Sequence, residues 1–389
     1  MGGFYKKPIV LVVHCVDTEG PIGGNVRRNA DGTAEFMSEW KEIKRTLHDI
    51  TNEDFRQKNK DSTGESYKYN WFIMDFTGFR TNPKERIQEY NNTYDNIKSL
   101  NTSIDSFHWH YHHPPSSGVG DQWSDDWNSS QEYINILGNR IMHRQDFPEV
   151  FRAGGTIEDN KCSLWLEDNL MIDYSNRVSH RSQPTDNIFD FNWHSAPPHW
   201  GYYRPSKDNF LDIGKMRRYV VRCVDLRSRL HELQQWQCDE AFAYAKYAQK
   251  PIILSYFSHD HRDMRDETNY AISLINKSYK KYGIDFKYCD AKEALQVAAN
   301  IKSREVEIEF KRVEDKLEIF FTDYIYQKNP FVYTLDKNDN LSYHKLEVEP
   351  LIGCKYVSRC ILPIYENIRK VGVACTSTAG DKTVKVIEL

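Results

Sequence analysis

Residues 8–20 read PIVLVVHCVDTEG, an apolar run that ends at two carboxylates. The run over 9–13 is short and rich in β-branched residues, which predicts a buried strand of a parallel sheet. Asp17 and Glu19 follow it, two residues apart. Functional side chains in parallel α/β folds lie at the carboxyl ends of the strands, so this stretch predicts both the fold and the place of the site.

Outward from this stretch, short apolar runs alternate with segments of helical periodicity as far as residue 302. The predicted strands cover 9–13, 71–76, 103–108, 148–152, 171–174, 189–193, 216–221, 251–257 and 286–288. The predicted helices cover 38–50, 83–100, 130–142, 161–169, 227–249, 269–282 and 291–299, and the polar stretch 51–69 is predicted to be an exposed insertion. About seven strand–helix units over roughly 300 residues indicate an α/β barrel of the TIM type.

The periodicity changes after residue 302. Apolar residues at 306, 308 and 310 alternate with glutamates, and apolar residues at 317, 319 and 321 alternate again with other side chains. Such alternation is typical of strands with one buried face. We therefore predict a barrel over 1–302 and a separate antiparallel β domain, a small sandwich, over 303–389.

The composition excludes several classes of protein. The net charge is −4 and the pI is near 6.4, so no basic surface for nucleic acid is expected. No apolar run reaches the roughly 18 residues that span a bilayer, and the N-terminal segment lacks the features of a signal peptide. The eight cysteines form no CxxC pair, which favours reduced thiols and a cytoplasmic protein.

A histidine cluster follows the third predicted strand. Residues 106–114 read SFHWHYHHP, with His108, His110, His112 and His113 within six positions. Residues 108, 110 and 112 share one face if the strand continues, and 108 and 112 share one face if the chain turns helical. Neutral imidazole is a common ligand of zinc and similar ions. The sequence therefore predicts a metal site here and leaves open which two histidines bind.

Other titratable residues stand at further strand ends. Asp17 and Glu19 can divide the roles of base and metal ligand, and the guanidinium of Arg152 can hold a carboxylate such as Asp17. His259 follows the strand at 251–257 and has the pKa range of a general acid, with His261 as its rival.

Aromatic residues make up 13% of the chain, with 24 Tyr and 9 Trp. Their apolar faces and polar tips suit sugar rings. Asp190 and Trp193 stand at another predicted strand end and are candidates for substrate binding. Further candidates for stacking on a sugar are Trp109, Trp123, Trp127 and Trp200, and the loop at 114–130 is a candidate lid.

The order of these motifs over residues 8–295 resembles the metal-dependent polysaccharide deacetylases. The resemblance implies a distorted (β/α)7 barrel that holds a divalent ion, with zinc expected, by one acidic residue and two histidines. It further implies an aspartate base, an arginine that holds the base and a late histidine that protonates the leaving amine.

Carried over by position, Asp17 is similar to the base and Glu19 to the acidic ligand, with Asp17 a second candidate ligand. His108 and His112 fit the family's His-x-x-x-His spacing, and His110 offers another alignment. Phe151-Arg152 with Gly155 resembles the arginine motif, Asp190 and Trp193 stand near the Asp/Trp motif, and His259 is similar to the late histidine. Thr18 departs from the family's adjacent pair of aspartates.

The resulting hypothesis is a hydrolase that removes an N-acetyl or similar acyl group from an amino sugar of a surface-polysaccharide precursor. Two alternatives remain open: a catalytically silent glycan-binding protein on the same barrel, and a hydrolase of a non-sugar amide. The β domain has three candidate roles, which are to bind glycan, to form a homo-oligomer or to cover the barrel.

Overall fold

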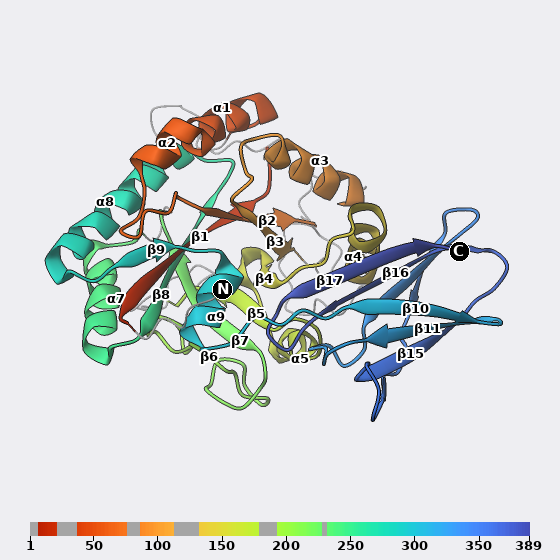
Figure 1. Cartoon of the computed structure of the whole chain (residues 1–389). Helices are drawn as coiled ribbons and strands as arrows, with labels where there is room; N and C mark the ends of the chain where they lie inside the picture. The colour runs from red at the N-terminus through yellow and green to blue at the C-terminus, as the bar shows by residue number, and fades with distance from the viewer. Residues whose placement is uncertain (1–6, 22–36, 76–85, 113–131, 179–192, 228–231) are drawn as a thin grey trace.

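Seven parallel strands close into a barrel in the computed structural model, which describes residues 7–21, 37–75, 86–112, 132–178, 193–227 and 232–389 (Figure 1). In the order of pairing, the barrel strands are β1 (Ile9–Thr18), β2 (Tyr69–Met74), β3 (Ser106–Tyr111), β4 (Val150–Ala153), β5 (Ile172–Asn176), β7 (Tyr219–Asp225) and β8 (Pro251–His259), which pairs with β1. The predicted α/β barrel is confirmed.

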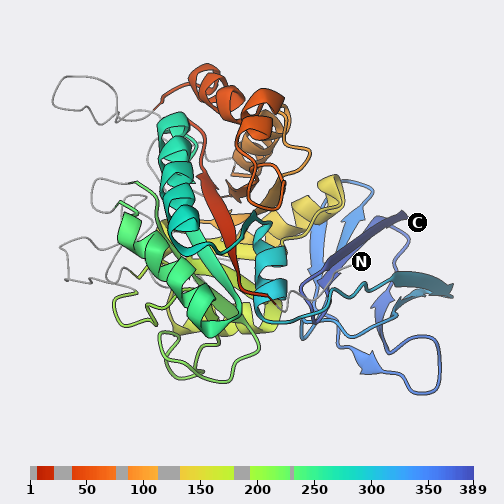
Figure 2. The ribbon, with the colours of Figure 1, turned by 60° about the vertical axis from the view of Figure 1, so that its left-hand side comes forward.

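Helices follow most of the barrel strands and cover the outside of the barrel (Figure 2). They are α1 (Trp40–Thr51), α2 (Glu53–Lys58), α3 (Arg86–Lys98), α4 (Glu132–Asn139) with the π-helical turn Arg140–Arg144, α5 (Asn160–Asn169), α7 (Gln235–Ala248) and α8 (Met264–Tyr282). Between β5 and β7, the described residues form a short strand, β6 (Tyr202–Tyr203), antiparallel to β7. In the part of the chain that the structure describes, no helix combines the length and apolarity needed to cross a bilayer.

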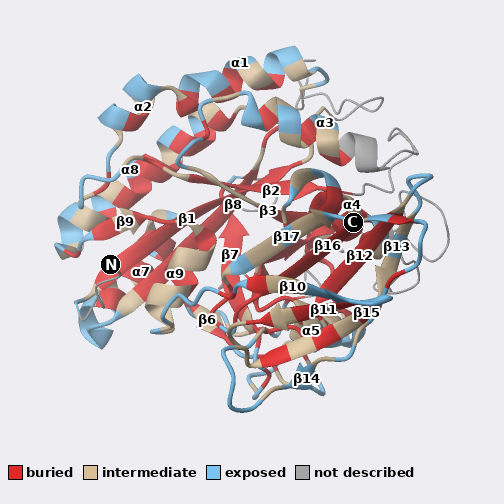
Figure 3. Cartoon of the chain, turned by 45° about the vertical axis from the view of Figure 1, so that its right-hand side comes forward, coloured by how far each residue is buried: buried red, intermediate tan, exposed pale blue. Residues whose placement is uncertain are grey.

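Strand β1 pairs with three other strands, β8, β2 and β9 (Phe286–Tyr288). It pairs with β8 from Ile9 to Asp17, and with β2 from His14 to Thr18. Its side chains alternate: Leu11 belongs to the core cluster inside the barrel, and Val12 to the cluster under the outer helices. Figure 3 shows these strands buried and the outer helix faces exposed.

The amino-terminal end of the barrel is closed. Strand β9 (Phe286–Tyr288) pairs with the first half of β1, and helix α9 (Ala291–Ala298) follows it. Ala294 and Leu295 of α9 are buried in the same cluster as the interior side chains Ile9 and Leu11. Among the described residues, α9 therefore covers the amino-terminal end of the barrel interior.

The C-terminal part is a pair of four-stranded antiparallel sheets, which confirms the predicted β architecture. One sheet has the order β10-β11-β15-β14 and the other β13-β12-β16-β17. Their bounds are β10 (Ile308–Val313), β11 (Lys316–Phe321), β12 (Phe331–Asp336), β13 (Leu341–His344), β14 (Glu349–Pro350), β15 (Ser358–Pro363), β16 (Ile368–Thr376) and β17 (Lys382–Glu388).

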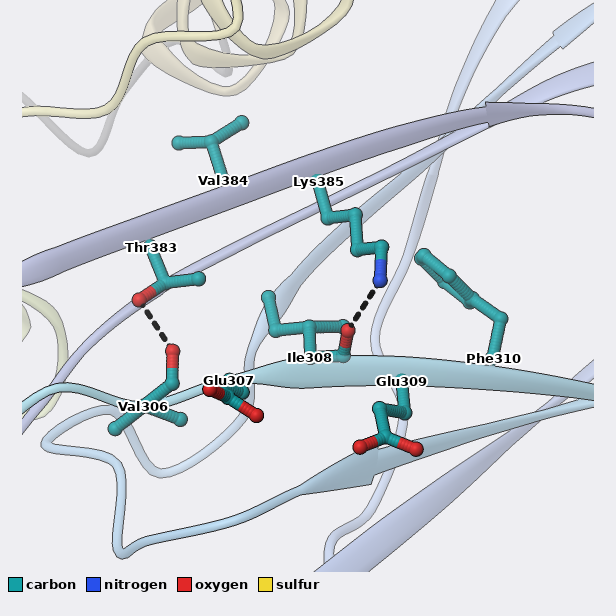
Figure 4. A pocket seen from close by; sticks show the side chains of 8 residues that line it. All are labelled: Val306, Glu307, Ile308, Glu309, Phe310, Thr383, Val384 and Lys385. Atoms are coloured by element: carbon teal, nitrogen blue, oxygen red, sulfur yellow. Dashed lines mark hydrogen bonds between the residues drawn. The ribbon is translucent and has the colours of Figure 1, made fainter.

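The edges of the two sheets meet at β10 and β17, where a shallow groove of about 600 Å³ opens (Figure 4). Thr383 Oγ1 donates a hydrogen bond of 2.6 Å to the carbonyl of Val306, and Lys385 Nζ donates one of 2.8 Å to the carbonyl of Ile308. These bonds satisfy two carbonyls of the edge that would otherwise need water.

The β region is less separate from the barrel than the sequence predicts. Tyr333 and Ala374 lie in one core cluster with Trp109 of the barrel and Leu137 of α4. Helix α4 approaches closely because residue 138 is glycine: a Cβ there would lie 2.5 Å from the ring of Tyr333. The alternation in sequence shows that the strands have a buried face, but it does not show what covers that face.

Residues 51–69 are in part exposed, as their polarity predicts, but several of them are buried. Arg56 of α2 is 1% exposed and makes two hydrogen bonds to Asp105, of 2.9 and 2.8 Å. The guanidinium also donates to the backbone carbonyls of Thr51, Tyr67 and Asn101. A buried arginine requires such partners, and one of them lies 49 positions along the chain, beyond the reach of local patterns.

Most predicted elements differ by a few residues from the observed bounds. The strand predicted at 103–108 continues as β3 through His110 to Tyr111, and β7 extends to Asp225 beyond the predicted 216–221. The helix predicted at 227–249 begins at Gln235, because Gln234 and Gln237 form a capping box. Of the strand predicted at 189–193, only residue 193 lies within the described residues, in a turn.

Gly138→Ala tests the contact between α4 and the β region. Alanine normally stabilises a helix interior by about 0.5–1 kcal/mol over glycine, but overpacking a core costs about 1–3 kcal/mol. We expect a net loss of about 1 kcal/mol or more in the free energy of unfolding, measured by urea denaturation. Asn135→Ala, at an exposed position of the same helix, is the control and should be neutral or stabilising. Equal stability of the two variants would contradict the tight contact.

Candidate metal centre at the carboxyl end of the barrel

Strand register brings the predicted site residues to one end of the barrel. Asp17 on β1 is the direct partner of His259 on β8, and His110 on β3 is the direct partner of Arg152 on β4. Asp17 and Glu19 lie on the same side, since each carboxylate lies within 4.0 Å of a ring nitrogen of His110 and of His259. Asp17 and His259, which are 242 positions apart in sequence, therefore lie side by side at this end of the barrel.

Glu19, His110 and His112 form a group suited to a metal ion. His110 Nε2 lies 3.0 Å from His112 Nε2, and Glu19 Oε1 lies 3.4 Å from His112 Nε2 and 3.7 Å from His110 Nε2. A tetrahedral zinc ion with bonds of about 2.0–2.2 Å places its ligand atoms about 3.3–3.5 Å apart. The donor atoms and their spacing therefore fit a zinc-like ion.

The surroundings fix both histidine rings. His110 Nδ1 lies 3.1 Å from the carbonyl oxygen of Arg152; a proton on Nδ1 satisfies this contact and leaves the lone pair of Nε2 for a metal. His112 packs against Gly154, where a Cβ would lie 2.4 Å from its Cγ. Only glycine leaves room for this ring, so Gly154 is part of the site.

The structure does not bring His108 to the metal ligands, although the His-x-x-x-His spacing favoured it. Strand β3 continues through the cluster, so His108 lies two residues closer to the amino-terminal end than His110, about 7 Å along the strand. Its Nε2 lies 3.3 Å from Asn70 Oδ1 and 3.6 Å from Asp290 Oδ2. These contacts tie β3 to β2 and to the start of α9.

Arg152 and Asp17 form a buried ion pair beside the ligands, as the sequence predicts. Arg152 Nε donates to Asp17 Oδ1 over 2.7 Å, its NH1 donates to the carbonyl of Tyr174 over 2.6 Å, and its side chain is fully buried. The guanidinium carbon lies 3.8 Å from the ring centroid of Phe257. Asp17 lies outside the group of three ligands, which leaves its carboxylate available as a base.

Both carboxylates of the site are ionised. Burial opposes ionisation of Asp17, but Arg152, His110 and His259 outweigh it and lower the pKa of Asp17. Burial likewise opposes ionisation of Glu19, and hydrogen bonds with His110 and His112 bring its pKa well below the ordinary range.

The two ligand histidines differ in their affinity for a proton. Burial lowers the pKa of His110, but Asp17 and Glu19 more than compensate and raise it above 6.5. Burial and the neighbouring charge of His110 lower the pKa of His112. A proton that competes with a metal ion is therefore held mainly by His110.

Of the two late histidines, His259 is the more exposed, and it lies beside both carboxylates. Its Nε2 lies 3.9 Å from Asp17 Oδ2 and 4.0 Å from Glu19 Oε1, and its side chain is 27% exposed. His261 is 4% exposed, with Nδ1 3.9 Å from Glu19 Oε2. Burial lowers the pKa of His261 to about 3, so this ring is neutral. A proton donor has to reach its substrate, which favours His259.

The three candidate tryptophans among the described residues are buried and present no face to a sugar. Trp193 is fully buried and donates its indole N–H to the carbonyl of Thr156 over 2.6 Å. Trp109 and Trp200 are 0% and 2% exposed. Asp190, Trp123, Trp127 and the candidate lid at 114–130 lie outside the described residues.

No protein-family model and no curated protein matches this chain. The resemblance to polysaccharide deacetylases therefore stays a prediction from the motifs.

Single histidine substitutions distinguish the two ligand sets. We expect His110→Gln to weaken zinc binding by at least about 100-fold, because it removes one of three ligands. His108→Gln should change the zinc affinity by less than about threefold, since its ring contacts Asn70 and Asp290 instead. Titration of each metal-free variant with zinc in competition with a chromophoric chelator measures the two dissociation constants for zinc. A larger loss of zinc affinity in His108→Gln than in His110→Gln would assign His108 to the metal instead.

The pKa of His110 predicts how metal affinity depends on pH. Because its pKa is raised above 6.5, His110 is protonated below that value and must lose the proton when a metal binds. We expect zinc affinity to fall about tenfold per pH unit as the pH drops through this pKa, and to level off above it. Calorimetric titration at pH 6 in buffers of different ionisation enthalpy should show about one proton released per ion. Affinity that does not change between pH 6 and 8 would contradict this assignment.

Proposed function

We propose that the protein is a metal-dependent hydrolase that removes an N-acetyl or similar acyl group from an amino sugar of a surface-polysaccharide precursor. The observation that supports it most is the buried ion pair of Arg152 with Asp17, which holds a carboxylate next to the three candidate ligands. The order of the sequence motifs and the closed seven-stranded barrel also agree with the deacetylase resemblance and with its distorted (β/α)7 barrel.

Glu19, His110 and His112 would hold the divalent ion, with zinc expected. The ion, when bound, polarises the acyl carbonyl and lowers the pKa of water. Asp17 accepts a proton from a water molecule while the oxygen of that water attacks the acyl carbon. Arg152 keeps Asp17 ionised and fixes its Oδ1, so Oδ2 is the oxygen that takes the proton.

His259 completes the reaction. Breaking the carbon–nitrogen bond requires a proton on the leaving nitrogen, and His259 is the exposed histidine on the side of Asp17. Burial lowers the pKa of His259, so the resting ring is neutral. We infer that the proton taken by Asp17 passes to His259, whose Nε2 lies 3.9 Å from Asp17 Oδ2, and then to the amine. The products are the free amino sugar and acetate.

The two halves of the proposal have different support. Amide hydrolysis rests on the arrangement of ligands, base and acid. The sugar rests on the motif order, since Trp109, Trp193 and Trp200 are buried and offer no platform. Hydrolysis of a non-sugar amide and silent glycan binding are therefore the other outcomes of the test.

Acetate release from N-acetylated amino sugars, free and nucleotide-linked, tests the reaction with zinc or cobalt added. We expect Asp17→Asn to lower kcat by about 100- to 10,000-fold, the usual contribution of a general base. Its metal content should stay near that of the wild type, because Asp17 is not one of the three ligands.

Metal analysis and thermal unfolding of Asp17→Asn provide the control for folding. Wild-type turnover in this variant would remove Asp17 from the role of base. Glycan binding by the wild type without acetate release would favour the silent protein, and release from simple amides alone would favour the non-sugar hydrolase.

A further inference from the structure

The ligand Glu19 lies just beyond the end of a strand. The last ladder partner on β1 is Thr18, which pairs with Ile73 of β2. Glu19 and Gly20 therefore lie outside the ladder that holds the rest of β1. A ligand on such a segment needs another restraint to keep its carboxylate opposite the two histidines.

Asp260 supplies hydrogen bonds at this point. Its Oδ1 accepts the backbone N–H of Glu19 over 2.9 Å and that of Gly20 over 3.2 Å. Its Oδ2 also accepts the N–H of Gly20, over 3.0 Å. In return, the backbone N–H of Asp260 donates to the carbonyl of Asp17 over 3.4 Å. Asp260 therefore holds the chain on both sides of Thr18.

Burial makes these bonds strong. Asp260 is 0% exposed, so water does not compete for its oxygens. Gly20 adopts φ +71°, and a Cβ there would lie 2.7 Å from Trp40. The turn therefore requires glycine, and it directs two successive N–H groups at one carboxylate.

The neighbour of Asp260 contacts the side chain of Glu19. His261 Nδ1 lies 3.9 Å from Glu19 Oε2, whereas Glu19 Oε1 faces His110 and His112. The segment after β8 thus approaches both the backbone and the outer oxygen of Glu19.

We propose that Asp260 is a positioning residue for the metal centre: it fixes the backbone of Glu19 and Gly20 and so sets the affinity for the ion. This inference rests on the metal centre of the proposed function, and not on the substrate.

The test is zinc affinity of the full-length, metal-free variants Asp260→Ala and Asp260→Asn. Loss of a residue that orients a ligand typically costs 10- to 100-fold in metal affinity, and we expect about that loss for Asp260→Ala. Asp260→Asn keeps an oxygen that accepts the Glu19 N–H, so its affinity should be intermediate. Equal affinity of all three proteins would overturn the positioning role.

Asp61→Ala is the matched control for a purely structural effect. Asp61 is also a buried loop carboxylate, and it accepts the backbone N–H groups of Thr63, Glu65 and Tyr288 near the amino-terminal end of β1. We expect it to lower the melting temperature without changing zinc affinity. The visible spectrum of the cobalt-loaded protein should change in Asp260→Ala only. An equal loss of zinc affinity in both variants would overturn the proposal.

The outcomes separate this inference from the proposed function. A wild-type protein that binds no zinc overturns both. A wild type that binds zinc but releases no acetate overturns the reaction, while a selective loss of affinity in Asp260→Ala still supports the positioning role.

Discussion

The carboxyl end of the barrel depends on the buried charge of Arg152. A guanidinium removed from water is tolerated only with anionic and carbonyl partners, and Arg152 finds Asp17 on β1 and the carbonyl of Tyr174 on β5. Its carbon lies over Phe257 of β8, and its own carbonyl contacts His110 of β3. Arg152 therefore connects β4 to three other strands through its side chain and to β3 through its backbone carbonyl, and it fixes Asp17 and the candidate ligand His110 together.

The sequence predicts the members of this site better than their roles. Asp17, Arg152 and His259 follow from the rule that functional groups stand at strand ends, because parallel strands bring those ends together. The choice among the histidines does not follow, since it depends on whether the chain continues as a strand after His108. Pairing with β4 settles this point: Tyr111 still pairs with Ala153, and alternation then places His110 and His112 beside Glu19.

The remaining differences have a common cause, which is contact between distant segments. Arg56 is buried because Asp105 lies beside it. Some buried side chains of the strands after residue 302 pack against α4. Trp193 is of a residue type that commonly stacks on sugar rings, but its side chain is buried against Phe210. Local patterns report which faces are apolar, and tertiary packing decides what those faces meet.

The position of Glu19 depends on a distant part of the fold. Alternation along β1 turns Thr18 away from the interior that Asp17 faces. Glu19, the candidate ligand, lies beyond the β1–β2 ladder. Hydrogen bonds to Asp260 hold its backbone where strand pairing has ended. The ligand and its anchor are 241 residues apart in sequence, so they have to be considered as one unit when the motif is compared with others.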